Sequence, residues 1–158
     1  MADVTSAVEQ LQAALGRAPG EELGVTEWFA IDQELVNRFA DCTRDHQWIH
    51  VDVDRAKRES PFGGTIVHGY LVFSLLPHFS YEVGVVPVGV RQAINYGAER
   101  VRFPAPVRVG SRIRDRITLL QLEGKGEGRV LMTLRHTVEI DGEARPALVA
   151  DTLAMLVV

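Results

Sequence analysis

The residues from His68 to about Val83 are apolar on nearly every side of a helix drawn through them. Such a helix is stable in water only when other parts of the fold cover it. Pro77 is expected to kink the helix, and Gly84 is expected to end it. The sequence therefore predicts one central helix that lies buried inside the fold.

The chain after Val90 has the apolar alternation that is typical of β-strands. Short turns, among them Asp141-Gly142, separate the last three strands and predict an antiparallel meander. The expected strands cover residues 91–103, 111–122, 130–140 and 146–158, with a turn at 124–128. A buried helix ahead of these strands predicts an α+β fold, in which an antiparallel sheet wraps around a long central helix.

The first half of the chain predicts shorter elements. Apolar spacing from Val4 to Leu15 indicates a helix within an N-terminal extension over residues 1–20. A strand is expected over residues 25–31, and a helix with Asp32 as its N-cap is expected to end near Arg44. Residues 49–60 suggest a short exposed helical turn. The whole chain, residues 1–158, is predicted to be one domain.

Charge and residue usage narrow the function. A net charge of −4 gives no basis for nucleic-acid binding. The single cysteine, Cys42, excludes an internal disulfide and a thiolate metal cage. The five histidines include no HExxH pair, so no metal site is predicted. Without a recognisable secretory signal or an uninterrupted apolar span, a cytoplasmic protein with no membrane partner is expected.

A polar loop before the central helix carries Asp45 and His50, and Gly69 stands where that helix begins. A carboxylate, an imidazole and a backbone N–H at a helix start can together activate water beside a polarised carbonyl. Polar loop residues also serve turns and helix caps. The residues alone leave both interpretations open.

The Asp45-x-x-x-x-His50 spacing, followed by PFG and the phrase IVHGYLVFSLL, resembles the MaoC-like (R)-specific enoyl-CoA hydratases. The loop TRDHQWIH and the later segment INYGAERVRFPAPVRVGSRIR are more similar to the NodN-like branch of that family. The resemblance extends from about Trp28 to the C-terminus.

This resemblance implies a hot-dog fold, a homodimer and an acyl-CoA thioester substrate, with no cofactor apart from the coenzyme A of the substrate. The implied enzyme is a hydro-lyase of fatty acid metabolism that adds water reversibly to trans-2-enoyl thioesters. Asp45 and His50 would hold and activate the water, and the Gly69 N–H would bind the thioester oxygen.

The sequence departs from the family pattern at several positions. The typical loop GD-x-N-P-x-H has Arg44, Gln47 and Trp48 here in place of glycine, asparagine and proline. A serine that supports the site in the hydratases falls at Pro77, and Ser74 is the nearest hydroxyl. These departures concern substrate range more than the type of reaction.

Further residues are candidates for substrate binding. Asn95, Tyr96 and Gly97 interrupt a strand and are expected to line a tunnel or to form a bulge. The other candidates are Gln47, Trp48, Phe62, His68, Tyr70 and Phe73, with Lys57, Arg91, Arg100 and Arg102 for the coenzyme A phosphates.

Two alternatives remain at this point. A hot-dog acyl-CoA thioesterase would direct the water at the carbonyl carbon and release a free thiol. A non-catalytic acyl-CoA-binding domain would bind without turnover, and it would not need the pair of Asp45 and His50.

Overall fold

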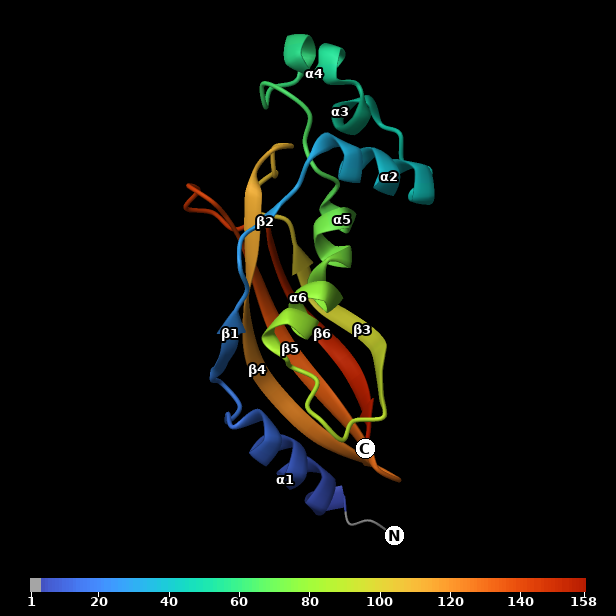
Figure 1. The fold of residues 1–158 in the computed structure, drawn as a ribbon, viewed down its shortest axis with the longest axis vertical. Helices are drawn as coiled ribbons and strands as arrows, with labels where there is room; N and C mark the ends of the chain where they lie inside the picture. The colour runs from blue at the N-terminus through green and yellow to red at the C-terminus, as the bar shows by residue number, and fades with distance from the viewer. Residues whose placement is uncertain (1–3) are drawn as a thin grey trace.

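The computed structural model describes residues 4–158 and shows a curved sheet with a helical segment across one face (Figure 1). The strands are β1 (Glu22–Val25), β2 (Phe29–Ala30), β3 (Gln92–Arg102), β4 (Arg112–Gly126), β5 (Arg129–Ile140) and β6 (Leu148–Val157). The helices are α1 (Val4–Leu15), α2 (Gln33–Thr43), α3 (Trp48–Val51), α4 (Val53–Glu59), α5 (Gly69–Ser74) and α6 (Leu76–Val83).

The sheet has the strand order β1-β4-β5-β6-β3, and β2 also pairs with β4. All the pairings are antiparallel, so the predicted meander of the last three strands is confirmed. β3 precedes the meander in the chain but pairs with β6, at the far edge of the sheet. The register of β3 shifts between Asn95 and Gly97, which confirms the predicted bulge.

The central helix differs from the prediction in two ways. It is divided into α5 and α6 by Leu75, because Pro77 has no N–H to continue the helix but is tolerated in a first helical turn. It is also buried on one side only. Leu71 and Phe79 face the core, whereas Tyr70 and Tyr81 are 72% and 69% exposed.

Two other predicted elements need correction. The strand expected over residues 25–31 is two short strands, β1 and β2, both paired with β4. The helical turn expected over residues 49–60 is two helices, α3 and α4, and it is not wholly exposed because His50 and Ala56 are buried. The N-terminal helix is confirmed over α1; residues 1–3 of the predicted extension lie outside the described part of the chain.

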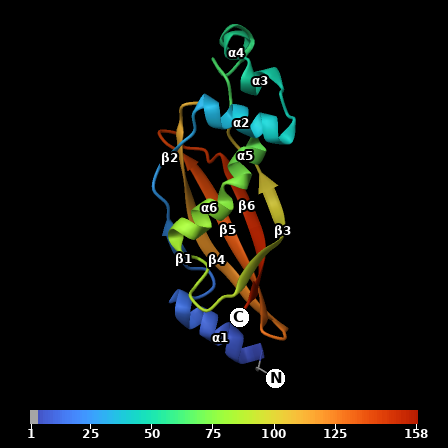
Figure 2. The same cartoon turned by 45° about the vertical axis from the view of Figure 1, so that its right-hand side comes forward.

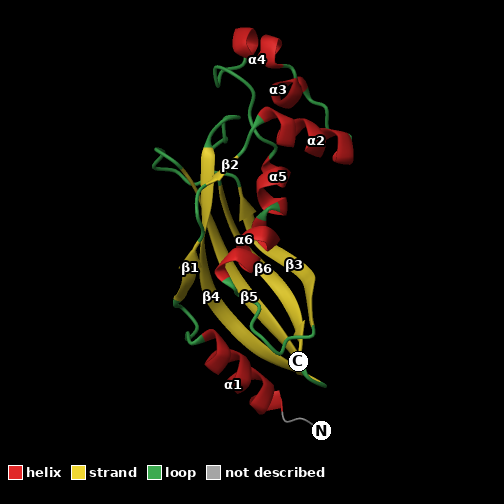
Figure 3. Cartoon of the chain, viewed as in Figure 1, coloured by secondary structure: helices red, strands yellow, loops and turns green. Residues whose placement is uncertain are grey.

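The polar loop lies at one end of the central helix. α2, α3 and α4 gather beyond the sheet at the start of α5, and α1 lies at the opposite end (Figure 2). α5 and α6 form the helical segment that crosses the sheet (Figure 3). No helix within residues 4–158 has both the length and the apolar character needed to cross a bilayer.

Candidate active site

The loop that carries Asp45 is fixed by the end of α2. Asp32 caps the start of that helix, where its carboxylate accepts a hydrogen bond from the Leu35 N–H at 2.8 Å. At the other end, Arg44 adopts a left-handed backbone conformation with φ 66°. This conformation turns the chain out of the helix, so that Asp45 begins the loop with a side chain that is 52% exposed.

His50 lies on α3 and is buried, with 7% of its surface exposed. Its Nδ1 lies 2.7 Å from the carbonyl oxygen of Ile66, so Nδ1 carries the hydrogen and donates it. Nε2 is then left with a free lone pair. Burial lowers the pKa of His50, and the nearby His68 lowers it further, against opposing effects of Ile66 and Asp45. His50 is therefore a neutral base at pH 7.

His68 occupies the N-cap position of α5 without a capping bond from its side chain, and it is only 2% exposed. Its ring stacks on the His50 ring with centroids 3.8 Å apart, and Phe39 packs at 5.1 Å. The His68 Nε2 lies 3.0 Å from the backbone oxygen of Asp45 and donates to it. His68 thus ties the Asp45 loop to the central helix, and its Nδ1 is buried without a partner within the described chain.

One side-chain ligand atom from each of Asp45, His50 and His68 lies within 4.8 Å of the others. The predicted closeness of Asp45 and His50 is confirmed, and His68 joins them. A cluster of this size can hold one small molecule such as water, or a cation. The stacked rings lie at only 26° to one another, so their in-plane lone pairs run side by side and do not converge as ligands of one ion must. The geometry favours water.

Gly69 is the first residue of α5, where backbone N–H groups have no partner inside the helix. A side chain at this position would meet the Phe103 ring, because a Cβ would lie 3.0 Å from Phe103 Cδ1. The Gly69 N–H therefore lies next to His68 in the chain, at the end of the helix that carries partial positive charge.

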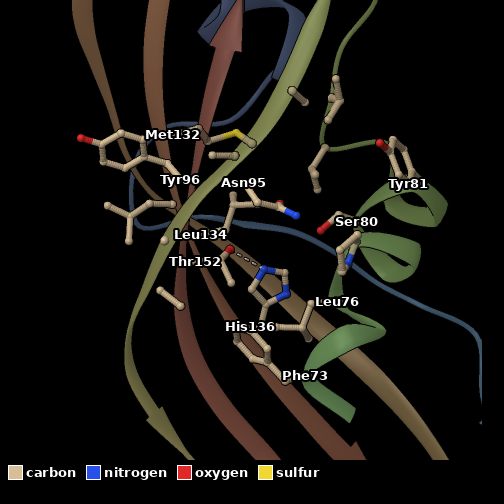
Figure 4. A pocket seen from close by; sticks show the side chains of 18 of the residues that line it. Phe73, Leu76, Ser80, Tyr81, Asn95, Tyr96, Met132, Leu134, His136 and Thr152 are labelled. Atoms are coloured by element: carbon tan, nitrogen blue, oxygen red, sulfur yellow. Dashed lines mark hydrogen bonds between the residues drawn. The ribbon is translucent and has the colours of Figure 1, made fainter. Parts of the chain in front are cut away.

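A cavity of about 570 Å³ lies between the α5–α6 segment and the strands β3, β5 and β6 (Figure 4). Phe73 lines it and follows Gly69 by four residues, about 6 Å of helix rise. The predicted residues Asn95, Tyr96 and Gly97 also line the cavity. The structure therefore brings these four predicted residues together along one pocket.

The other predicted binding residues do not line this cavity. Trp48 is half-buried beneath the Arg55 guanidinium, 4.3 Å from the ring centroid. Gln47 is exposed, Phe62 is 38% exposed, and the exposed Tyr70 ring meets Phe103 edge-on. These four side chains are exposed or half-buried outside the cavity, and His68 belongs to the cluster with Asp45 and His50.

The cationic candidates are dispersed. Arg91 donates to the carbonyl oxygen of Val158, Arg100 lies 3.6 Å from the Asp151 carboxylate, and Arg102 bonds the neighbouring Val101 carbonyl. Lys57 is exposed on α4. They form no single basic patch in the protomer.

Three polar residues of the cavity region were not singled out in the sequence. Asp115, His136 and Thr152 come from β4, β5 and β6 and form a hydrogen-bonded row. Asp115 alternates with Ile113 and Ile117, which are fully buried. The sequence signal for this row is that Asp115 and His136 each stand where the alternation of the strand predicts an apolar, inward-facing residue.

Comparison with known proteins gives the chain its relatives. Residues 14–141 match the family described as "MaoC like domain". The chain is 50% identical over 145 residues to 3-hydroxyacyl-thioester dehydratase Z of Mycobacterium tuberculosis, covering 92% of this chain and 95% of that protein. It is 45% identical over 138 residues to Nodulation protein N of Rhizobium leguminosarum bv. viciae, covering 87% and 85%.

Solved structures give the same picture of the fold. The (R)-hydratase from A. caviae involved in PHA biosynthesis is similar with a TM-score of 0.70 and 22% identity, covering 87% of this chain and 96% of that chain. This likeness, together with the six-stranded antiparallel sheet, confirms the predicted α+β hot-dog architecture.

Proposed function

The chain belongs to the MaoC-like domain family, and from this membership we propose that it is a hydro-lyase acting on acyl thioesters. It adds water reversibly to trans-2-enoyl thioesters and forms (R)-3-hydroxyacyl thioesters. The observation that supports this most strongly is the cluster of Asp45, His50 and His68 beside the N–H of Gly69.

The proposed reaction begins with one water molecule held between the Asp45 carboxylate and the free Nε2 of His50. Nε2 accepts a water proton while the water oxygen forms a bond to C3 of the enoyl group. The π electrons of the C2–C3 double bond move toward the carbonyl and place negative charge on the thioester oxygen. His50 then returns the proton to C2, so one water is added and the enzyme is regenerated.

The Gly69 N–H stabilises the charge that develops on the thioester oxygen. A single donor of this kind is typically worth about 3 kcal/mol of activation free energy. Because the glycine has no side chain, the acyl group can approach the helix start closely. The acyl chain then continues into the cavity that begins at Phe73.

A homodimer is the second part of the proposal. β3 is eleven residues long and, among residues 4–158, pairs only with β6, so its other edge offers N–H and C=O groups unpaired by this part of the chain. Ten of its eleven residues are exposed, including Ile94 at 51% and Tyr96 at 65%. Long apolar edge strands are normally covered. A second copy that pairs along this edge would also close the open side of the cavity.

The proposal places the enzyme in the cytoplasm with coenzyme A as the carrier. An exposed free thiol at Cys42 is compatible with a reducing compartment. Among residues 4–158, Lys57 is the cationic candidate without a hydrogen bond or ion pair to the protein, so we assign its exposed ammonium group to the coenzyme A phosphates.

The test of the activity is hydration of crotonyl-CoA, with chiral analysis of the product and a thiol reagent to detect hydrolysis. Asp45→Asn and His50→Ala should each abolish most of the hydration. His46→Ala is the matched control, because His46 lies in the same loop but pairs with Asp41 on the surface. Full activity in either site variant, or thiol release in place of hydration, would refute the assignment.

The dimer is tested separately by sedimentation. Ile94→Glu introduces a charge on the free edge strand and should produce monomers. Val88→Glu is the control, since Val88 is fully exposed outside β3. A monomeric wild-type protein, or an Ile94→Glu dimer, contradicts this part of the proposal.

A further inference from the structure

The cavity contains a built row of polar groups on the inner face of the sheet. His136 Nδ1 lies 2.6 Å from Asp115 Oδ2, and His136 Nε2 lies 2.9 Å from Thr152 Oγ1. Asp115 is 0% exposed and His136 is 1% exposed. His136 and Thr152 both line the cavity, and Figure 4 shows their hydrogen bond.

Burying these polar residues costs free energy of folding, and a cavity that binds only apolar chains would not need them. Buried polar groups lose their hydration, and an apolar replacement of similar volume is often neutral or stabilising. Asp115 Oδ1 has no hydrogen-bond partner within the described chain, so even this row leaves one buried acceptor unsatisfied. Stability alone therefore gives a poor account of why the row is present.

The protons in the row determine what it offers to a ligand. Burial raises the pKa of Asp115, which disfavours a negatively charged pair. When the Asp115 carboxyl carries its proton, it donates to His136 Nδ1 across the 2.6 Å contact. The ring hydrogen then lies on Nε2, which donates it to Thr152 Oγ1.

Thr152 then has its own hydroxyl hydrogen left to donate. Among residues 4–158, His136 is the only hydrogen-bond partner of the Thr152 hydroxyl. Ser80 from α6 and Asn95 from the edge strand β3 line the same cavity and add polar groups to its wall (Figure 4). The cavity therefore presents a hydrogen-bond donor backed by a buried relay, together with these further polar groups.

We propose that this cavity selects acyl chains that carry an oxygen acceptor, a keto or hydroxyl oxygen, beyond the reacting C2 and C3 atoms. The Thr152 hydroxyl donates to that oxygen, and His136 and Asp115 hold the hydroxyl in the donating orientation. The inference rests on the proposed function, because it assigns the cavity to the acyl part of the same thioester substrate. Thr152 is a specificity residue and takes no part in the chemistry.

The test is binding, so that it does not depend on turnover. Saturated medium-chain acyl-CoAs with one keto oxygen moved along the chain are compared with the unsubstituted acyl-CoA of the same length. One keto position should bind roughly five- to tenfold more tightly than the unsubstituted chain, the worth of one added hydrogen bond. Equal affinities at every position would overturn the inference.

Variants identify the donor. Thr152→Val keeps the shape and should abolish the preference for the keto chain, whereas Thr152→Ser should keep it. Thr133→Val is the matched control, since Thr133 lies on β5 between Met132 and Leu134 and does not line the cavity. Thermal unfolding of each variant verifies folding. A preference that survives Thr152→Val would assign the selection to another group and overturn the role of Thr152.

The two proposals fail in different ways. Absence of hydration of every enoyl-CoA, with the keto preference intact, would remove the hydratase assignment and leave the cavity as a binding site for oxygenated acyl chains. Hydration of crotonyl-CoA without any keto preference would leave the enzyme and remove the selectivity.

Discussion

The imidazole rings of His50 and His68 stack face to face, with centroids 3.8 Å apart and an angle of 26° between their planes. His50 lies on α3, shortly after α2 in the chain, and His68 directly precedes the first residue of α5. Each ring is fixed by a bond to a backbone carbonyl: His50 to Ile66, and His68 to Asp45. The stack therefore joins the loop that supplies the carboxylate to the helix that supplies the N–H.

Replacing His68 by Phe should shift the pH dependence of activity. The charge interaction with His68 lowers the pKa of His50, so its loss should raise that pKa. The acid limb of kcat/KM should then move to higher pH, and kcat should fall because Asp45 loses its tie to the helix. If His68 has only a structural role, the replacement will lower stability without shifting the acid limb of the kcat/KM profile.

The buried His50 should make stability depend on pH. Its pKa in the folded protein is lowered from the ordinary value of 6.5, so the unfolded chain binds the proton first as pH falls. The contribution of His50 to stability is present above pH 6.5 and decreases as pH falls through the lowered pKa. His50→Asn, which retains a donor for Ile66, should weaken this dependence in urea titrations between about pH 8 and pH 5. Identical slopes in the two proteins would contradict the shift.

Gly69→Ala should reduce both stability and activity. The added methyl group would lie 3.0 Å from Phe103 Cδ1. We expect the displacement that relieves this contact to move the N–H away from the thioester oxygen. Loss of the hydrogen bond to that oxygen should lower kcat by about a hundredfold. The double variant with Phe103→Ala should regain stability relative to Gly69→Ala but not activity. Recovered activity would mean that the glycine serves only to accommodate Phe103.

Arg44→Gly should stabilise the protein. Arg44 has a left-handed backbone with φ 66°, which a side chain disfavours. Glycine should raise the free energy of unfolding by about 0.5–1 kcal/mol after its greater entropy loss. Arg38→Gly is the contrasting control: it lies inside α2, where glycine should cost about 1 kcal/mol. A loss of stability in Arg44→Gly would contradict the inference that the backbone of Arg44 is strained.

Removal of metal ions should leave hydration unchanged. Asp45, His50 and His68 are close enough for one ion, but the stacked rings do not direct their lone pairs to a common point. Dialysis against a chelator and assay with crotonyl-CoA give the measurement. If activity is lost on dialysis and restored by one divalent cation, Asp45, His50 and His68 form a metal site and do not hold a water molecule alone.

Much of this protein follows from local sequence. The alternation of the last three strands, the cap at Asp32 and the end of α2 at Arg44 depend on neighbouring residues, and they are confirmed. The predicted family and fold are also confirmed. The Asp45–His50 spacing that indicated the family is local, since the two residues are five positions apart in the chain. The roles of Asp45, His50 and Gly69 remain predictions.

Only the tertiary structure decided which distant residues meet. His68 is 23 residues from Asp45, and Thr152 is 16 residues from His136, so no local pattern specifies these contacts. The position of β3 beside β6, and the exposed side of the central helix, likewise depend on how the sheet is ordered. Backbone preferences act between neighbours in the chain, whereas burial and strand pairing bring together residues that the sequence keeps apart.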